Sequence, residues 1–262
     1  MINSLLKALQ IMELFGDDHP RLTIKEISER LDMPKTTVFN ILNTLQTQGY
    51  IEKLENAEYA LGSSIISLGQ KARVNIEVRD RAAPLLRELA NRVRESIYLT
   101  VRDGDFSLYI YAIESSQRLM ARTAMGDRVH MHCTGVGKAT LAFLPHETVQ
   151  EIVGRVGLPK RTDNTIIDMS RLQEELQVTR KRGYSIDNCE IEPNTFCVGA
   201  PIFDAHGKVI GSCSISGNHP DIVGIQRDDF ADAIMRVAEE ISRRIGYVPV
   251  RATRLQTTNN RH

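Results

Sequence analysis

The sequence lacks the features that would direct a protein into or across a membrane. None of its apolar runs approaches the roughly 18 residues that a membrane-spanning helix needs. The N-terminal segment, MINSLLKALQIMELFGDDHP, contains acids and has neither the basic start nor the small-residue cleavage site of a signal peptide. We therefore expect a cytoplasmic protein with no membrane partner.

Cysteine is also scarce, and its spacing excludes a disulfide scaffold. The cysteines are far apart, and no CxxC pair occurs among Cys133, Cys189, Cys197 and Cys213. In a reducing compartment such residues are typically free, buried thiols.

The chain has no excess of either charge sign. Its 33 Lys and Arg residues balance 33 Asp and Glu residues. Residues 1–60 are acidic, because four Lys and two Arg face three Asp and six Glu, a balance of −3. Composition therefore argues against a broadly basic nucleic-acid binder, and any DNA-binding surface must concentrate its positive potential locally.

Residues 1–62 nevertheless have the pattern of a winged helix-turn-helix domain. Five apolar residues of the first helix share one stripe that ends at Gly16: Leu5, Ala8, Leu9, Met12 and Phe15. Thr23 and Glu26 form a capping box at the start of a second helix. A third helix follows a tight turn and stops at Gly49. A hairpin around residues 55–57 completes the motif.

The third helix, in LDMPKTTVFNIL, has a polar face that suits DNA. Its apolar face contains Val38, Ile41, Leu42 and Leu45. The polar face has one positive charge, no negative charge and five candidate DNA contacts: Lys35, Thr36, Thr37, Asn40 and Asn43. Lysine reaches phosphate or guanine, and the amide of asparagine matches adenine. The alternative is a solvated face in an ordinary three-helix domain.

The remainder predicts an α+β fold in which a linker helix leads to a second domain. We expect the linker helix at 63–82, the domain at 83–250 and a disordered tail at 251–262, with Pro84 breaking the helix or starting another. Mostly antiparallel strands with helices at the start, middle and end indicate this fold class. Strands are expected at 96–103, 106–114, 118–124, 127–132, 196–204 and 208–217, helices at 137–144, 170–183 and 224–245, and a loop between the first two of these helices.

The stretch HCTGVGKAT predicts a strand-to-helix turn that suits an anion. It fails the phosphate-loop pattern, because His132 and Ala139 occupy two required positions. Thr134 can cap a helix whose first N–H groups, from Gly135, Val136 and Gly137, would attract a carboxylate. The alternative is that the glycines only permit a tight turn.

The two late strands predict a hydroxyl-rich surface. If their loop is 204–207, Cys197 pairs with Ser214 and Gly199 with Ser212. Apolar residues then share one face, while Cys197, Ser212, Ser214 and Ser216 share the other. The alternative is an ordinary solvent-facing strand side.

Two further sites remain possible alternatives. His130, His132 and Cys133 lie close together and could bind a metal, although no zinc spacing such as HExxH occurs. Cys197 and His132 could form a nucleophile and base, although no nucleophile motif surrounds them. We expect neither a cofactor nor catalytic activity.

Several blocks together resemble the IclR family of bacterial transcriptional regulators, from about Ser4 to Gly246. They are SLLKALQIMELF, LTIKEISERLDMPKTTVFNILNTLQTQGYIEK, YALG, HCTGVGKATLAFLP, RGYSIDN, FCVGAPIFD and SISG. The resemblance implies a winged helix, a linker helix and a GAF-like effector domain. It also implies homodimers or tetramers that read inverted-repeat operators. The family usually has arginine where this chain has Asn40.

The resemblance also implies that an acidic residue, a cysteine and two serines help to bind the effector, and these match Asp187, Cys197, Ser214 and Ser216. We therefore predict a regulator that binds double-stranded operator DNA and responds to a small organic acid, such as a sugar acid or keto acid. The alternative function is a metal-dependent sensor or a small-molecule-processing enzyme that uses the Cys197 and His132 region.

Overall fold

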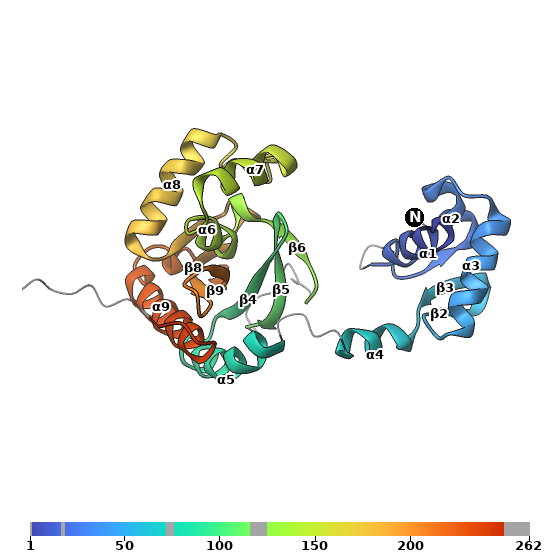
Figure 1. Ribbon diagram of the computed structural model, residues 1–262, viewed down its shortest axis with the longest axis horizontal. Helices are drawn as coiled ribbons and strands as arrows, with labels where there is room; N and C mark the ends of the chain where they lie inside the picture. Colours follow the sequence, from blue (N-terminus) through green and yellow to red (C-terminus); the bar gives the residue numbers. More distant parts are fainter. Residues whose placement is uncertain (1, 17–18, 72–75, 116–124, 249–262) are drawn as a thin grey trace, which may run out of the picture. The chain divides into compact units, whose positions relative to one another are not determined.

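The computed structural model describes residues 2–16, 19–71, 76–115 and 125–248, and only the backbone of 69–71 and 76–77. The predicted strand at 118–124 and the predicted tail at 251–262 lie outside these ranges. The chain divides into two compact units, Met1–Val74 and Asn75–His262, and each is described by itself (Figure 1). Within the described ranges, no helix is long and apolar enough to cross a membrane.

The first unit is a three-helix bundle with a small wing, as predicted. Helices α1 (Asn3–Glu13), α2 (Ile24–Leu31) and α3 (Lys35–Thr47) surround a core that includes Ile11, Ile27, Val38 and Leu42. Strands β1 (Leu22–Thr23), β2 (Ile51–Lys53) and β3 (Glu58–Leu61) form a sheet in the order β1-β3-β2. Helix α4 (Ser63–Lys71) follows the wing.

Local hydrogen bonds and backbone geometry define the turn that orients α3. The predicted capping box is present, because Thr23 Oγ1 accepts from the Glu26 N–H and Glu26 Oε2 accepts from the Thr23 N–H, at 3.4 and 2.7 Å. Asp32 ends α2 with a left-handed φ of 49°, and Pro34 immediately precedes α3. The chain thus reverses within three residues, and the polar face of α3 remains outside the core.

The predicted apolar stripe of α1 is wrong at its N-terminal end. Leu5 and Leu9 are 57% and 44% exposed, whereas Ile11, which lies off that stripe, is fully buried. Only the C-terminal half of α1 enters the core of this unit. Leu6 in this half and Ile2, which immediately precedes α1, are also exposed, so four large apolar side chains lie uncovered at this end of the helix.

The second unit is built on one antiparallel sheet of six strands in the order β6-β5-β4-β9-β8-β7. This architecture confirms the predicted α+β class. The strands are β4 (Ser96–Asp103), β5 (Phe106–Ile113), β6 (Arg128–His130), β7 (Ser185–Asn188), β8 (Phe196–Phe203) and β9 (Val209–Gly217). Helices α5 (Ile76–Val93) and α9 (Arg227–Arg244) cover one face, and α6 (Gly135–Leu141) packs on the other (Figure 1).

Two local predictions for this unit are wrong, and one strand was not predicted. Residues 146–156 form α7 (His146–Val156) instead of a loop, and the buried Val149 and Ile152 were the helical signal. Pro84 neither breaks nor starts α5, because it lies inside that helix on an exposed side, where water can reach the carbonyl it leaves unpaired. Strand β7 was not predicted, and α8 (Met169–Arg182) follows α7.

The predicted register of β8 and β9 is wrong by two residues, but the assignment of faces is right. Cys197 pairs with Ser216, and Gly199 pairs with Ser214. The turn contains five residues, 204–208, and a bulge at Ile210 adds one more. Two added residues restore the period-two alternation of the strands.

Each face of the sheet therefore has its own character. Val198, Ala200, Cys213 and Ile215 join the apolar core under α5 and α9. The other face carries Cys197, Ser212, Ser214 and Ser216, and all four are buried. The predicted hydroxyl-rich surface is thus an interior wall, and the solvent-facing alternative does not apply.

Candidate functional site

The exposed face of α3 carries the predicted DNA contacts. Lys35, Thr36, Asn40 and Asn43 are exposed, and Thr37 is half-buried. No acidic residue occurs between Lys35 and Thr47. A face with these properties can approach a phosphate backbone without charge repulsion.

Phe39 is a member of this face that the sequence analysis missed. Its ring is 44% exposed and lies one turn after Lys35 and one turn before Asn43. An apolar ring at that place suits the methyl group of thymine. Its position between two candidate DNA contacts was the signal available in the sequence.

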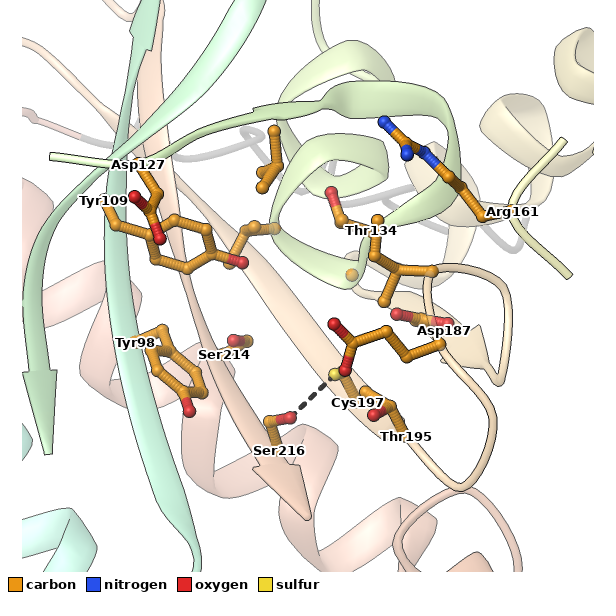
Figure 2. Close-up of a pocket in the computed structure, with 15 residues that line it drawn as sticks. Tyr98, Tyr109, Asp127, Thr134, Arg161, Asp187, Thr195, Cys197, Ser214 and Ser216 are labelled. Carbon is orange, nitrogen blue, oxygen red and sulfur yellow. Dashed lines mark hydrogen bonds between the residues drawn. The ribbon is translucent and has the colours of Figure 1, made fainter. Parts of the chain in front are cut away.

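The second unit contains a cavity of about 280 Å³ between the sheet and the start of α6 (Figure 2). All six strands of the sheet contribute to its walls, together with the residue before β6, the start of α6, the loop between α7 and α8, and the loop between β7 and β8. Its lining residues are Tyr98, Tyr109, Asp127, Val129, Thr134, Gly135, Val136, Arg161, Asp187, Ile191, Glu192, Thr195, Cys197, Ser214 and Ser216. The walls are therefore rich in hydroxyl and carboxyl groups.

The predicted anion-binding turn lies against this cavity, with one correction. Thr134 caps α6 as expected, and its Oγ1 accepts from the Gly137 N–H at 3.0 Å. That N–H is therefore occupied, and Gly137 does not line the cavity. Gly135 and Val136 do line it, so two of the three predicted N–H groups belong to residues at the cavity wall.

Glycine at 135 and 199 allows α6 to approach the sheet at backbone distance. A Cβ added at Gly199 would lie 2.8 Å from the Gly135 carbonyl oxygen, closer than real contacts allow. Ser185 Oγ donates to that carbonyl at 2.5 Å, and Ser212 Oγ donates to the Val136 carbonyl at 2.7 Å. Ser212 thus holds the helix and does not line the cavity.

Asp187 places a buried carboxyl group in the cavity wall. Its side chain is fully buried, and its Oδ1 accepts from the Glu190 N–H at 2.8 Å. Within the described part of the chain, Oδ2 has no hydrogen-bond partner. Burial and the nearby Glu190 charge raise the pKa of Asp187 to about 7.

A buried ion pair lies behind Asp187, and the sequence analysis missed it. Lys138 of α6 is 1% exposed and pairs with Glu190, and Lys138 Nζ lies 3.9 Å from Glu175 Oε1 of α8. Burial raises the pKa of Glu190. Glu175 pairs in turn with Arg182 at 2.8 Å. These contacts link α6, the loop after β7 and α8. A lysine within an otherwise apolar helix was the available signal.

The predicted Cys197 and serines meet at the cavity. The Cys197 thiol donates to Ser216 Oγ at 2.9 Å, and Ser214 lies nearby on the same wall (Figure 2). Tyr98 and Tyr109 form an edge-to-face pair with ring centroids 5.5 Å apart. Neither tyrosine was predicted as a site residue.

The metal and nucleophile alternatives do not fit these positions. His132 is buried with Nε2 3.2 Å from the Pro159 carbonyl oxygen, and burial lowers its pKa to about 4. The His130 ring lies beside it, while burial raises the pKa of the Cys133 thiol to about 12. None of the three lines the cavity that contains Cys197. No group of three potential metal ligands occurs in the described ranges.

Comparison with known proteins gives one family for both units. Residues 4–55 match the IclR helix-turn-helix domain, and residues 70–243 match the family described as bacterial transcriptional regulator IclR C-terminal.

Individual relatives span nearly the whole chain. The HTH-type transcriptional regulator KdgR of Dickeya chrysanthemi is 32% identical over 94% of this chain and 81% of its own length. KipR of Bacillus subtilis is 29% identical over 93% of this chain and 97% of its own length. The crystal structure of the Thermotoga maritima IclR is 31% identical, has a TM-score of 0.79, and covers 94% of this chain and 100% of that one.

The raised pKa of Asp187 predicts how stability depends on pH. The ordinary value is 3.8, so the folded state retains a proton that the unfolded state releases between about pH 4 and pH 7. The free energy of unfolding therefore falls as pH rises through this window. Replacement of Asp187 by Asn removes this loss and leaves an oxygen that can accept from Glu190. The thermal midpoint of D187N, relative to the parent, should rise across the window and level off above it.

Calorimetric scans at several pH values check this expectation. D163N is the matched control, because Asp163 is an exposed carboxylate whose pKa is lowered by Lys160. The charge of Asp187 interacts with four neighbours: Glu190, Lys138, Cys197 and Cys133. The dependence of the thermal midpoint on pH therefore reflects these five residues together. A constant difference between D187N and the parent would contradict the raised pKa.

Proposed function

The chain belongs to the IclR family of bacterial transcriptional regulators, and we propose that it binds operator DNA through α3 and releases or retains that DNA when a small organic acid fills the cavity of the second unit. Such a protein would act in the cytoplasm, beside the chromosome. The observation that carries the proposal is the cavity: a small, hydroxyl-lined space with an unpartnered buried carboxyl oxygen, in a chain whose other unit is a winged helix-turn-helix.

The DNA-binding part of the proposal assigns base and phosphate contacts to the exposed face of α3. Asn40 has the amide that pairs with adenine in the major groove, and Lys35 carries the charge for a phosphate or guanine. Thr36, Thr37 and Asn43 would position the helix on the backbone. The acidic surroundings would keep non-specific binding weak at physiological salt.

We also propose that the protein works as a homodimer or tetramer. One helix in the groove covers too little surface for a specific operator, so two half-sites about one helical turn apart are expected. Exposed apolar side chains at the start of the chain and on α4 offer apolar area for contact with a second copy: Ile2, Leu5, Leu6, Leu9, Ile66 and Leu68.

The effector part assigns hydrogen bonds to the cavity wall. The orphan Oδ2 of Asp187 would pair with a hydroxyl group of the effector, since a buried polar atom without a partner is costly. Ser214 and Ser216 would bond its polar groups, with Cys197 packed beside them. The carboxylate of the effector would lie at the start of α6, where Gly135 and Val136 line the cavity. His132 does not line the cavity beside Cys197, so a Cys197–His132 nucleophile and base has no support there.

Two substitutions on α3 test the DNA contacts. N40A should weaken binding to the selected operator by about 1–3 kcal/mol if the amide contacts a base in two places. K35A should weaken binding to all sequences and flatten the salt dependence, as loss of a phosphate contact does. Gel-shift titrations at two salt concentrations measure both. K25A is the matched control, because Lys25 is exposed on α2. Parent-like titrations for both α3 variants would remove α3 from the interface.

The exposed apolar surface of α1 leads to a prediction about assembly. Light scattering at micromolar concentration should give at least the mass of a dimer. The double substitution L5Q/L9Q should raise the dissociation constant, because it removes apolar area that association would bury. I225Q controls for loss of an exposed apolar side chain in the second unit, since Ile225 is 85% exposed. A monomeric parent would overturn the oligomer.

A cavity substitution tests the effector. An organic acid that raises the thermal midpoint should also change operator affinity in the gel shift. S214A should weaken binding of that acid by about 0.5–1.5 kcal/mol, the net value of one hydrogen bond. S107A is the matched control, because Ser107 is a buried serine that does not line the cavity. Equal affinity for the parent and S214A would exclude Ser214 from the site.

A further inference from the structure

Arg161 lies in the loop between α7 and α8, and this loop is fastened to the loop that follows β7. The N–H groups of Arg161 and Thr162 both donate to Thr165 Oγ1, at 3.0 and 2.8 Å. Thr165 Oγ1 donates to the Glu190 carbonyl at 2.7 Å, and Thr162 Oγ1 donates to the Cys189 carbonyl at 2.6 Å. The backbone at Arg161 is therefore held in place beside the segment that carries Asp187.

The charge of Arg161 has no counter-ion in the described part of the chain. Arg161 is an exposed residue that lines the cavity, and its guanidinium forms no ion pair and no side-chain hydrogen bond there. The preceding cations differ, because Arg155 pairs with Asp105 at 2.8 Å and Lys160 with Asp163 at 2.7 Å. Among the described lining residues, Arg161 is the one cationic side chain. An unpaired guanidinium at a cavity is suited to a carboxylate, which it can bind through two parallel hydrogen bonds.

The position of Arg161 within the cavity divides the lining into two ends. Figure 2 shows Arg161 on the side of Thr134 and the start of α6, whereas Tyr98 and Ser214 lie toward the opposite side. Gly135 follows Thr134 at the start of α6, whereas Val136 packs with Tyr98 and Tyr109. A carboxylate at this end would lie beside both the guanidinium and the start of α6 at Gly135 (Figure 2). The other end offers hydroxyl groups to the uncharged part of the same molecule.

We infer that Arg161 is the specificity-determining residue of the cavity: it binds the carboxylate of the effector and makes the site prefer an organic acid to a neutral molecule of the same shape. This inference rests on the proposed effector-binding function. In this view the effector's carboxylate is recognised mainly by the Arg161 side chain, which lies in a loop, and less by the N-terminus of α6. The Arg161 charge would then determine which chemical class binds, while Asp187, Ser214 and Ser216 would select among the acids.

The test compares each acid with its primary amide. Pyruvate, gluconate and 4-hydroxybenzoate, each beside the corresponding amide, are titrated calorimetrically into the full-length parent and into R161Q, R161K and K160Q. The parent should bind one acid at least tenfold more tightly than its amide. R161Q should lose about tenfold in affinity for the acid and change less than twofold for the amide. R161K should fall between them, because lysine retains the charge but loses the planar fork. K160Q, which removes the neighbouring exposed charge, should match the parent.

The outcomes distinguish failure of this inference from failure of the proposed effector-binding function. Parent-like acid affinity in R161Q would overturn the role of Arg161 and leave the organic-acid effector standing. An equal loss for acid and amide would also overturn it, because Arg161 would then shape the cavity without reading charge. If no acid binds the parent while operator binding is intact, the organic-acid effector itself fails, and this inference fails with it. The thermal midpoint of ligand-free R161Q establishes that the variant is folded.

Discussion

The contact between Gly135 and Gly199 is the constraint on which the second unit depends. Because neither residue has a side chain, the first turn of α6 lies directly on β8. That distance brings two helix carbonyls within reach of serine hydroxyls from the sheet, Ser185 and Ser212. It also buries Lys138 beside Glu190. The cavity is the space that remains where the helix begins, and its small volume follows from the same close approach.

The buried charges behind the cavity define geometry more than they add stability. An ion pair loses hydration when it is buried, so the Lys138–Glu190 pair contributes little net free energy to folding. What it provides is a fixed distance between α6 and the loop after β7, which carries Glu190. Glu190 contacts both Lys138 and Asp187, through its side chain and its backbone N–H respectively. A ligand that engages Asp187 therefore acts on a residue already joined to two other elements of the unit. Such a connection is a physical basis for a response to ligand. Substitution of Glu190 would weaken the connection and leave the cavity itself in place.

Local signals explain which parts of this structure could be predicted. The capping box at Thr23 and the cap at Thr134 depend on residues three positions apart, and both are present. The two faces of β9 follow from alternation, so the serine-rich wall was predictable. The pairing of Cys197 with Ser216 was not, because the bulge at Ile210 depends on tertiary packing. Arg161 and Tyr98 were missed for a related reason: each reaches the cavity only through the fold, Arg161 from a loop and Tyr98 from a predicted strand whose neighbours in the sheet were not predicted.

The number of residues between β8 and the paired part of β9 determines which face of β9 meets α6. The five-residue turn alone would place the apolar face of β9 against α6. The extra residue at Ile210 reverses this, so that the serine-rich face meets α6. A change of one residue in the turn, without a matching change in the bulge, would send Cys213 and Ile215 toward the cavity and the serines into the apolar core. Related sequences can therefore vary the residues of the turn freely. A change of one residue in the length of the turn requires a matching change in the bulge. The serine-rich wall of the cavity therefore depends on the number of residues in a turn that does not line the cavity.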